Sequence, residues 1–206
     1  MKQFWNRFID QHYAKPRGII GASIGEIMVR QHHEEMKWTI DILNVQAGET
    51  FLELGTGAGH GIAYLLSQTD TKHVTGLDLS KTMVRSATLR NRQAIQTNRA
   101  TIQRANLIHL KLVHETVEGI YSIRTIYFWE SVDRTLQEMY RALRPGGRFV
   151  LTYCDGKAGE EGEELHERIE REFIPLANKM GFESVILKRG PVICSFHTVA
   201  LVRYKG

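Results

Sequence analysis

The sequence is poor in several features that would assign it to particular protein classes. It has 206 residues but only four prolines and two cysteines, Cys154 and Cys194, which stand far apart and outside any CxxC pattern. Neither a zinc site nor a disulfide scaffold is therefore indicated, and two buried thiols are expected. No apolar run approaches the ~18 residues that a membrane span requires. No Gly-Lys-Ser or Gly-Lys-Thr of a P-loop occurs.

The N-terminus also lacks the apolar stretch and the small-residue cleavage site of a secretory signal peptide. We therefore expect a cytoplasmic protein that has no membrane partner. Residues 1–47 read as mostly helical, because Val29, Met36, Ile40 and Leu43 recur at helical spacing on one face. Such a segment ahead of the first strand is expected to act as a lid or to pack on the edge of a sheet.

Acidic residues are missing from one long stretch. Between Leu79 and His114 there is no Asp or Glu, while the basic residues there are Lys81, Arg85, Arg90, Arg92, Arg99, Arg104 and Lys111. A basic surface can bind nucleic acid or acidic lipid. More often, such a pattern marks the solvated face of a helix, and this is the interpretation favoured here.

Short apolar runs alternate with helical patterns after residue 47. Strands are predicted over Thr50–Leu54, His73–Leu77, Ile108–Val113, Ile120–Trp129 and Arg148–Tyr153, with Ser80 as the N-cap of a helix. This alternation is typical of a parallel sheet covered on both faces. The last two strands, Glu183–Leu187 and His197–Tyr204, are joined by a short loop. They are predicted to be antiparallel, because a parallel crossover needs a dozen or more residues.

A glycine-rich turn follows the first of these strands. It reads Gly55-Thr56-Gly57-Ala58-Gly59, between an apolar strand and a helical pattern. Glycine permits positive φ and lets backbone N–H groups approach a ligand closely. A dinucleotide fingerprint requires GxGxxG, and counting from Gly55 places His60 at the last glycine position. The pattern is therefore GxGxG, which disfavours an NAD-binding domain.

The second strand ends at Asp78. An acid in this place, at the carboxyl end of a parallel strand, can accept hydrogen bonds from both hydroxyls of a ribose and disfavours a 2′-phosphate. An Asp at a strand end is often only a helix N-cap. The glycine turn and the acid together, each closing its own strand, favour a nucleoside site.

Three ordered motifs resemble those of class I S-adenosylmethionine-dependent methyltransferases. They are Glu53–Gly59 (ELGTGAG), Gly76–Ser80 (GLDLS) and Leu136–Arg148 (LQEMYRALRPGGR). The resemblance implies an α/β fold, a three-layer Rossmann-like sandwich. Its sheet would be mostly parallel and seven-stranded, with an antiparallel last strand. Residues 1–47 would form the N-terminal helical lid and residues 48–206 the S-adenosylmethionine-binding domain.

The resemblance also implies roles for single residues. Gly55, Thr56, Gly57 and Gly59 would line the methionine and ribose side of the cofactor, Glu53 would order the loop, Asp78 would hold the ribose and Leu79 would cover one face of adenine. Glu115 or Thr116 would take the adenine-contact position after the predicted third strand. The loop there is shorter than the family pattern, which raises the alternative of a cofactor-binding relative that is catalytically degenerate.

Catalytic residues are harder to identify, because an in-line methyl transfer needs a base only if the acceptor must lose a proton. Candidates for an acceptor pocket are Tyr127, Trp129, Glu130, Tyr13 and His33. Alternatively, the aromatic residues simply pack in the core and Glu130 caps the next helix. No cluster of His, Cys and Asp has the spacing of metal ligands, so no metal is expected.

The leading prediction is methyl transfer from S-adenosylmethionine to a small-molecule acceptor. An RNA methyltransferase is less favoured, since no Asn/Asp-Pro-Pro-Tyr/Phe motif ends the fourth strand; a nucleic-acid partner is accordingly not expected. Neither the identity of the acceptor nor the oligomeric state follows from the sequence.

Overall fold

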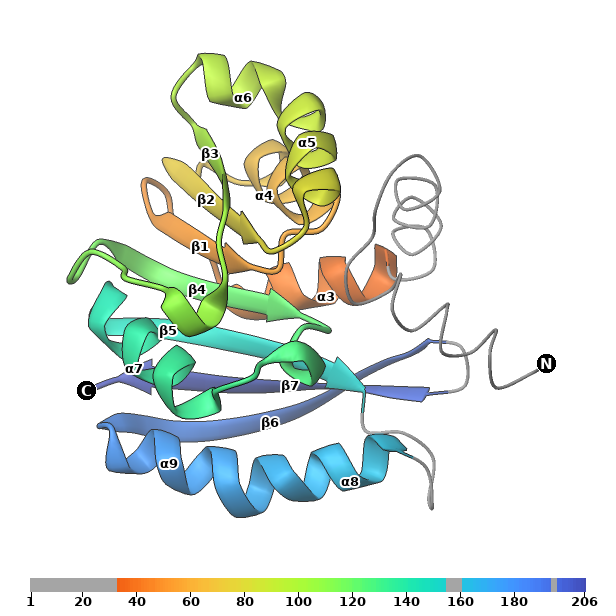
Figure 1. Ribbon diagram of the computed structural model, residues 1–206, viewed down its shortest axis with the longest axis vertical. Coiled ribbons are helices and arrows are strands. Elements are labelled where there is room, and N and C mark those ends of the chain that lie inside the picture. Colours follow the sequence, from red (N-terminus) through yellow and green to blue (C-terminus); the bar gives the residue numbers. More distant parts are fainter. Residues whose placement is uncertain (1–32, 155–160, 194–195) are drawn as a thin grey trace.

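The computed structural model describes residues 33–154, 161–193 and 196–206. Figure 1 shows the order of the elements along the chain. The helices are α3 (His33–Leu43), α4 (His60–Gln68), α5 (Lys81–Arg90), α6 (Arg92–Gln96), α7 (Val132–Ala142), α8 (Glu161–Arg168) and α9 (Ile174–Lys179). A π-helical segment, η3 (Ile169–Phe173), joins α8 to α9, and η1 (Leu107–His109) and η2 (Ile126–Phe128) are short 3-10 turns.

The strands are β1 (Thr50–Leu54), β2 (His73–Asp78), β3 (Ala100–Arg104), β4 (Val117–Ile123), β5 (Leu143–Cys154), β6 (Phe182–Ile193) and β7 (Phe196–Lys205). They form one seven-stranded sheet in the order β3-β2-β1-β4-β5-β7-β6. The pairs from β3 to β5 are parallel, and β7 is antiparallel to both of its neighbours. The predicted Rossmann-like sheet with its reversed last strand is thus confirmed.

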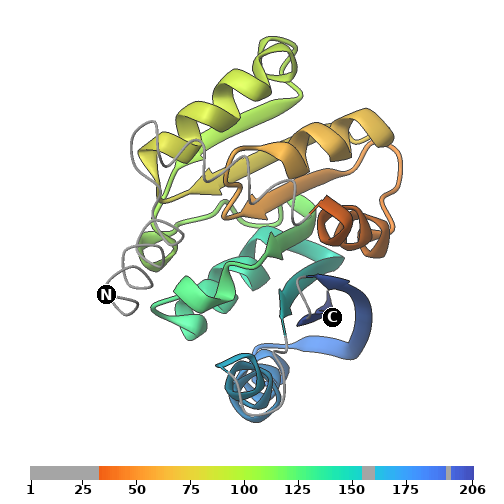
Figure 2. The same ribbon diagram turned by 90° about the vertical axis from the view of Figure 1, so that its right-hand side faces the viewer.

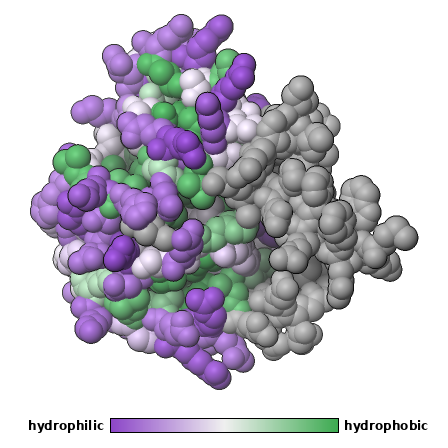
Figure 3. Space-filling model, in the orientation of Figure 1, coloured by the Kyte–Doolittle hydropathy of each residue, from purple (hydrophilic) through white to green (hydrophobic). Residues whose placement is uncertain are grey.

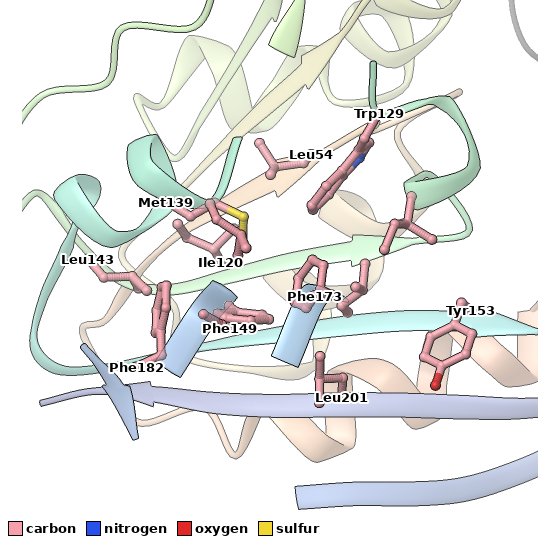
Figure 4. Close-up of a cluster of buried hydrophobic side chains, with 14 of the residues drawn as sticks. Leu54, Ile120, Trp129, Met139, Leu143, Phe149, Tyr153, Phe173, Phe182 and Leu201 are labelled. Atoms are coloured by element: carbon pink, nitrogen blue, oxygen red, sulfur yellow. The ribbon is translucent and has the colours of Figure 1, made fainter. Parts of the chain in front are cut away.

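Two apolar clusters hold helices on opposite faces of the sheet (Figure 2). On one face, buried side chains of α3 and α4, such as Ile40 and Leu65, pack against Phe51 and Val150. On the other face, α7 and the α8–α9 unit contribute Leu136, Met139, Phe173 and Ala177. Figure 4 shows this second cluster around Ile120, Phe149 and Leu201. The three-layer sandwich therefore fixes the carboxyl ends of β1, β2 and β4 relative to one another.

Only the end of the predicted N-terminal lid falls within the described residues. Met36, Ile40 and Leu43 lie buried on one face of α3, as their spacing predicts, and this helix packs on the sheet. Val29 and the rest of residues 1–32 lie outside the described part. Of the two cysteines, Cys154 is buried at the end of β5, and Cys194 lies outside the described residues.

The predicted third strand, Ile108–Val113, is wrong. The third strand is β3, Ala100–Arg104, and it pairs in parallel with β2 so that Arg104 lies opposite Asp78. The apolar residues Leu107, Leu110 and Leu112 instead pack, partly buried, against the core below α7. An apolar run that covers a core edge in this way has the composition of a strand without being one.

The fourth and fifth strands also differ in extent from the prediction. The strand expected to run to Trp129 ends at Ile123, because Arg124 takes a left-handed φ of 54°. Strand β5 begins at Leu143, so the Pro145-Gly146-Gly147 turn lies within its bounds. Ser80 caps α5 as predicted, accepting a hydrogen bond from the Met83 N–H.

No helix in the described part of the chain has both the length and the apolar character needed to cross a membrane. The exposed surface over α5 and α6, at the top of Figure 3, is predominantly hydrophilic.

Candidate functional site

The glycine turn between β1 and α4 is held by main-chain hydrogen bonds to the neighbouring strand. The N–H groups of Gly55 and Thr56 both donate to the Leu77 carbonyl, at 2.8 and 2.9 Å. Gly55, Gly57 and Gly59 have φ of 77°, 52° and 79°, a region that side chains other than glycine rarely adopt. The turn therefore has a fixed path that exposes main-chain atoms at the carboxyl edge of the sheet.

The surroundings of the three glycines differ. A Cβ added at Gly55 would fall 2.2 Å from the Thr125 methyl carbon, and one at Gly59 would fall 2.8 Å from Ala87 on α5. A Cβ added at Gly57 would meet nothing within 4 Å. Gly55 and Gly59 are thus packed against protein, whereas Gly57 faces open space in which a ligand can approach the main chain.

Glu53 lies beneath this turn, buried near the end of β1. The Thr56 hydroxyl donates to its Oε2 at 2.6 Å, and its Oε1 lies 2.4 Å from where a Cβ of Gly61 would be, against the first turn of α4. Burial raises the pKa of Glu53 to about 8, although the Thr56 hydroxyl and the nearby Tyr121 phenol lower it. The carboxyl group therefore links the turn to the core, the position that the resemblance implies for it.

Asp78 lies beside the glycine turn. Its Oδ2 accepts from the Gly57 N–H and its Oδ1 from the Ser80 N–H, both at 2.8 Å. Burial raises the pKa of this carboxyl, and the two N–H donors oppose the shift. Each carboxylate oxygen can accept a further hydrogen bond. The structure thus brings Gly57, Asp78 and the half-buried Leu79 to one edge, as predicted for a nucleoside site.

Glu115 and Thr116 do not reach this edge. They precede β4, and their N–H groups donate to the carbonyls of Arg141 and Ala142 at 2.9 and 2.8 Å. Because β4 runs parallel to β1, the start of β4 lies at the end of the sheet opposite the glycine turn. The expectation that either residue contacts adenine followed from the misplaced third strand.

The residues that follow the true third strand lie at the right edge instead. The Ala105 N–H donates to the Asp78 carbonyl at 3.0 Å, and Asn106 and Leu107 come next. The sequence analysis missed this segment, although the β-branched pair Thr101-Ile102 after Asn98 was an available signal for a strand.

The acceptor candidates after β4 separate into core and surface positions. Trp129 is buried, packs against Phe173 and donates from Nε1 to the Thr125 hydroxyl at 3.0 Å (Figure 4). Tyr127 is half-exposed, and its hydroxyl accepts from the Cys154 N–H at 2.8 Å. Glu130 is exposed, and Ser131 rather than Glu130 caps α7. Only Tyr127 and Glu130 thus remain available to line an acceptor site.

The two N-terminal candidates are placed differently. His33 begins α3, is exposed and lies edge-on to Tyr64, with ring centroids 6.2 Å apart. Tyr13 lies outside the described residues. Within the described ranges no group of three His, Cys, Asp or Glu side chains could hold a metal ion.

Sequence reasoning also missed a buried ion pair at the end of β4. Arg124 donates from Nε to Glu35 Oε2 on α3 at 2.7 Å, across 89 positions of sequence. No local pattern signals such a pair, because its members meet only once α3 has packed on the sheet.

Comparison with known proteins agrees with this geometry. Residues 52–151 match the family described as "Methyltransferase domain". The chain is 24% identical over 161 residues to the "Uncharacterized methyltransferase YdaC" of Bacillus subtilis (strain 168), covering 78% of this chain and 86% of that protein.

A second relative is the demethylmenaquinone methyltransferase of Oceanobacillus iheyensis, 31% identical over 128 residues. That alignment covers 60% of this chain and 52% of the relative, so the chain matches about half of its length. Among solved structures, a Haemonchus contortus phosphoethanolamine N-methyltransferase with phosphomonomethylethanolamine and S-adenosylhomocysteine superposes with a TM-score of 0.69 at 16% identity, covering 83% of this chain and 52% of that one. This last likeness concerns the fold alone.

Proposed function

Because the chain belongs to the class I S-adenosylmethionine-dependent methyltransferase family, we propose that it transfers the methyl group in line to a small-molecule acceptor beside the ends of β1 and β4. The observation that carries the proposal is the 2.8 Å hydrogen bond between the Gly57 N–H and Asp78 Oδ2. It joins a bare stretch of main chain to a carboxylate across two neighbouring strands.

The residues present fit S-adenosylmethionine. Open space adjoins Gly57, so that its main chain can contact the aminoacyl and ribose part. Asp78 retains acceptor capacity for the two ribose hydroxyls. When bound, this cofactor supplies a methyl group activated by the positive charge of its sulfonium.

The chain's own contribution is then positioning. Holding nucleophile and methyl group in line supplies up to ~7–11 kcal/mol in well-oriented cases. Burial raises the pKa of Tyr127 to about 12, while the Cys154 N–H and Arg124 act to lower it, so its phenol stays protonated at neutral pH. We therefore assign Tyr127 to the wall of the acceptor site and not to the role of general base.

The alternatives proposed from the sequence lose their main supports. A degenerate, non-catalytic relative was suggested by a short loop after the third strand, but residues 105–116 separate β3 from β4. The RNA hypothesis rested on the basic stretch. Three of its arginines donate to main-chain carbonyls of the fold: Arg90 to Ala58, Arg99 to Leu66 and Thr71, and Arg104 to Leu79.

The test is ligand binding by the wild type and by Asp78→Ala, with the exposed Asp41→Ala on α3 as the matched control. S-adenosylmethionine and S-adenosylhomocysteine at 100 times Kd should add ~2.7 kcal/mol, about 5–10 °C in Tm, and NAD should add nothing. Asp78→Ala should weaken binding about 10- to 100-fold, since hydrogen bonds to a charged group are lost. Asp41→Ala should bind as the wild type does. Stabilisation by NAD alone, or undiminished affinity of Asp78→Ala, would refute the proposal.

A further inference from the structure

We propose that Arg124 binds an oxyanion of the methyl acceptor, a carboxylate or a phosphate, at the carboxyl end of β4. The inference rests on the proposed function, because it names the chemical class of the acceptor for that same site. It is carried by the position of Arg124, its backbone conformation and its hydrogen-bond partners.

The position links Arg124 to the cofactor side of the site. Arg124 directly precedes Thr125, whose methyl group packs against Gly55, the first residue of the glycine turn. Ser122, just before it on β4, donates from its hydroxyl to the Leu54 carbonyl at 3.1 Å. Residues 122–125 are thus fixed to the end of β1, where the cofactor main-chain contacts are proposed.

The backbone of Arg124 is strained. Its φ of 54° lies in the left-handed region, and its N–H donates to the Thr152 carbonyl on β5 at 2.8 Å. Conformations of this kind cost free energy in residues other than glycine and cluster at functional sites. The strain directs the chain out of β4 and fixes where the side chain of Arg124 begins.

The guanidinium has an unused donor. Its Nε donates to Glu35 Oε2, whereas its Nη2 is buried and has no hydrogen-bond partner among the described residues. A buried charged donor left in this state is costly and rare in proteins. Guanidinium forms paired hydrogen bonds with carboxylates and phosphates, so an oxyanion is the ligand that such a donor suits.

Within the pair, the cation is the member that reaches the surface. The side chain of Arg124 is 23% exposed and that of Glu35 is 0% exposed. Burial acts to lower the pKa of Arg124, but the Glu35 carboxylate outweighs it, and the net shift of that pKa is upward. The site therefore presents a permanent positive charge, with its counter-charge held on the far side in α3.

Two aromatic rings adjoin this charge on η2. Tyr127 and Phe128 are 44% and 50% exposed, with their centroids 6.2 Å apart in an edge arrangement. Exposed rings of this size beside a cation suit an acceptor that has an apolar body and an oxyanion. The proposed acceptor class is thus an apolar acid or a phosphate ester.

The experiment uses the protein loaded with S-adenosylhomocysteine and three probes of similar size: benzoate, phenyl phosphate and benzamide. Binding is measured by calorimetry and thermal shift for the wild type, Arg124→Gln and Arg124→Lys, with the exposed Arg92→Gln on α6 as the matched control. At least one anionic probe should bind the wild type more tightly than benzamide, and the preferred one identifies carboxylate or phosphate. Arg124→Gln should lose about 10- to 100-fold in affinity for that probe. Arg124→Lys should lose less, and Arg92→Gln should match the wild type.

Equal binding of all three probes by the wild type, or an unchanged anion preference in Arg124→Gln, would overturn the proposal. S-adenosylhomocysteine affinity is the internal reference, because Arg124 is outside the Gly57–Asp78 contact. If this affinity is intact in both Arg124 variants, they are folded, and the loss belongs to the acceptor side. A wild type that fails to bind S-adenosylhomocysteine would overturn the proposed function itself, together with this inference.

Discussion

Gly55 and Gly57 share a left-handed backbone but have different surroundings, so an alanine should affect them in different ways. Their φ values are 77° and 52°. A Cβ at Gly55 would lie 2.2 Å from the Thr125 methyl carbon, and a Cβ at Gly57 would meet nothing within 4 Å. The first substitution should therefore damage stability and the second should damage ligand binding.

The size of each effect follows from these contacts. A left-handed conformation costs a residue other than glycine ~1–2 kcal/mol, which is the whole stability cost expected for Gly57→Ala. Gly55→Ala adds overpacking of ~1–3 kcal/mol, for a total of about 2–5 kcal/mol. At ~2–4 °C per kcal/mol for a chain of this size, Tm should fall by about 2–8 °C and about 4–20 °C respectively. Gly57→Ala should also lose about 10-fold or more in S-adenosylhomocysteine affinity, because its methyl group occupies the space beside the main chain.

The clash at Gly55 can be relieved by a second substitution. Thr125→Ser removes the methyl group but keeps the hydroxyl that accepts from Trp129 Nε1. The double variant Gly55→Ala/Thr125→Ser should therefore recover about 1–3 kcal/mol relative to the sum of the single variants, as measured by urea denaturation. The reasoning is refuted if the two substitutions add within ~0.5 kcal/mol, or if Gly57→Ala is the less stable of the two glycine variants.

Two further predictions concern buried charge. Burial raises the pKa of Glu53 from 4.5 to about 8, so the folded protein binds a proton that the unfolded chain releases, and the free energy of unfolding falls as the pH rises through this window. Glu53→Gln should flatten that slope in urea denaturations at about pH 5 to 9; an unchanged slope would contradict the assignment. Arg203 is fully buried and its Nε and Nη1 have no partners among the described residues, whereas Arg148 binds Glu49 through both Nη atoms. In thermal denaturation Arg203→Met should cost no more than about 1 kcal/mol and Arg148→Met about 3 kcal/mol, and equal losses would be inconsistent with this difference in partners.

The cofactor half of the site could be predicted from the sequence, because it depends on local backbone requirements. A turn that needs left-handed φ at Gly55, Gly57 and Gly59 selects glycine at these positions whatever surrounds it. Asp78 closes the strand that pairs directly with β1, so its distance from the turn is set by the sheet spacing. Both features are visible as residue types at fixed separations.

The third strand could not be found in the same way. β3 lies at the edge of the sheet, and of its residues only Ala100 is buried, while Gln103 and Arg104 are exposed. Its pattern therefore lacks the continuous apolar character of the central strands. The more apolar run that follows, including Leu107, Leu110 and Leu112, packs against α7 and the core without joining the sheet. Apolar content reports burial, and here burial and strand formation occur in different segments.

The acceptor half depends on contacts between distant segments, and this explains why its residues escaped prediction. Trp129 has the composition of a pocket wall, yet α8–α9 places Phe173 against it and makes it part of the core. Arg124 has the composition of a surface residue, yet α3 brings Glu35 to it. The helices that cover the two faces therefore decide which side chains after β4 remain accessible. Substitutions in α3 that shift Glu35, such as Ile40→Ala in the stripe that packs α3 on the sheet, should accordingly alter the anion preference assigned to Arg124 while leaving the Gly57–Asp78 contact, and with it cofactor affinity, unchanged.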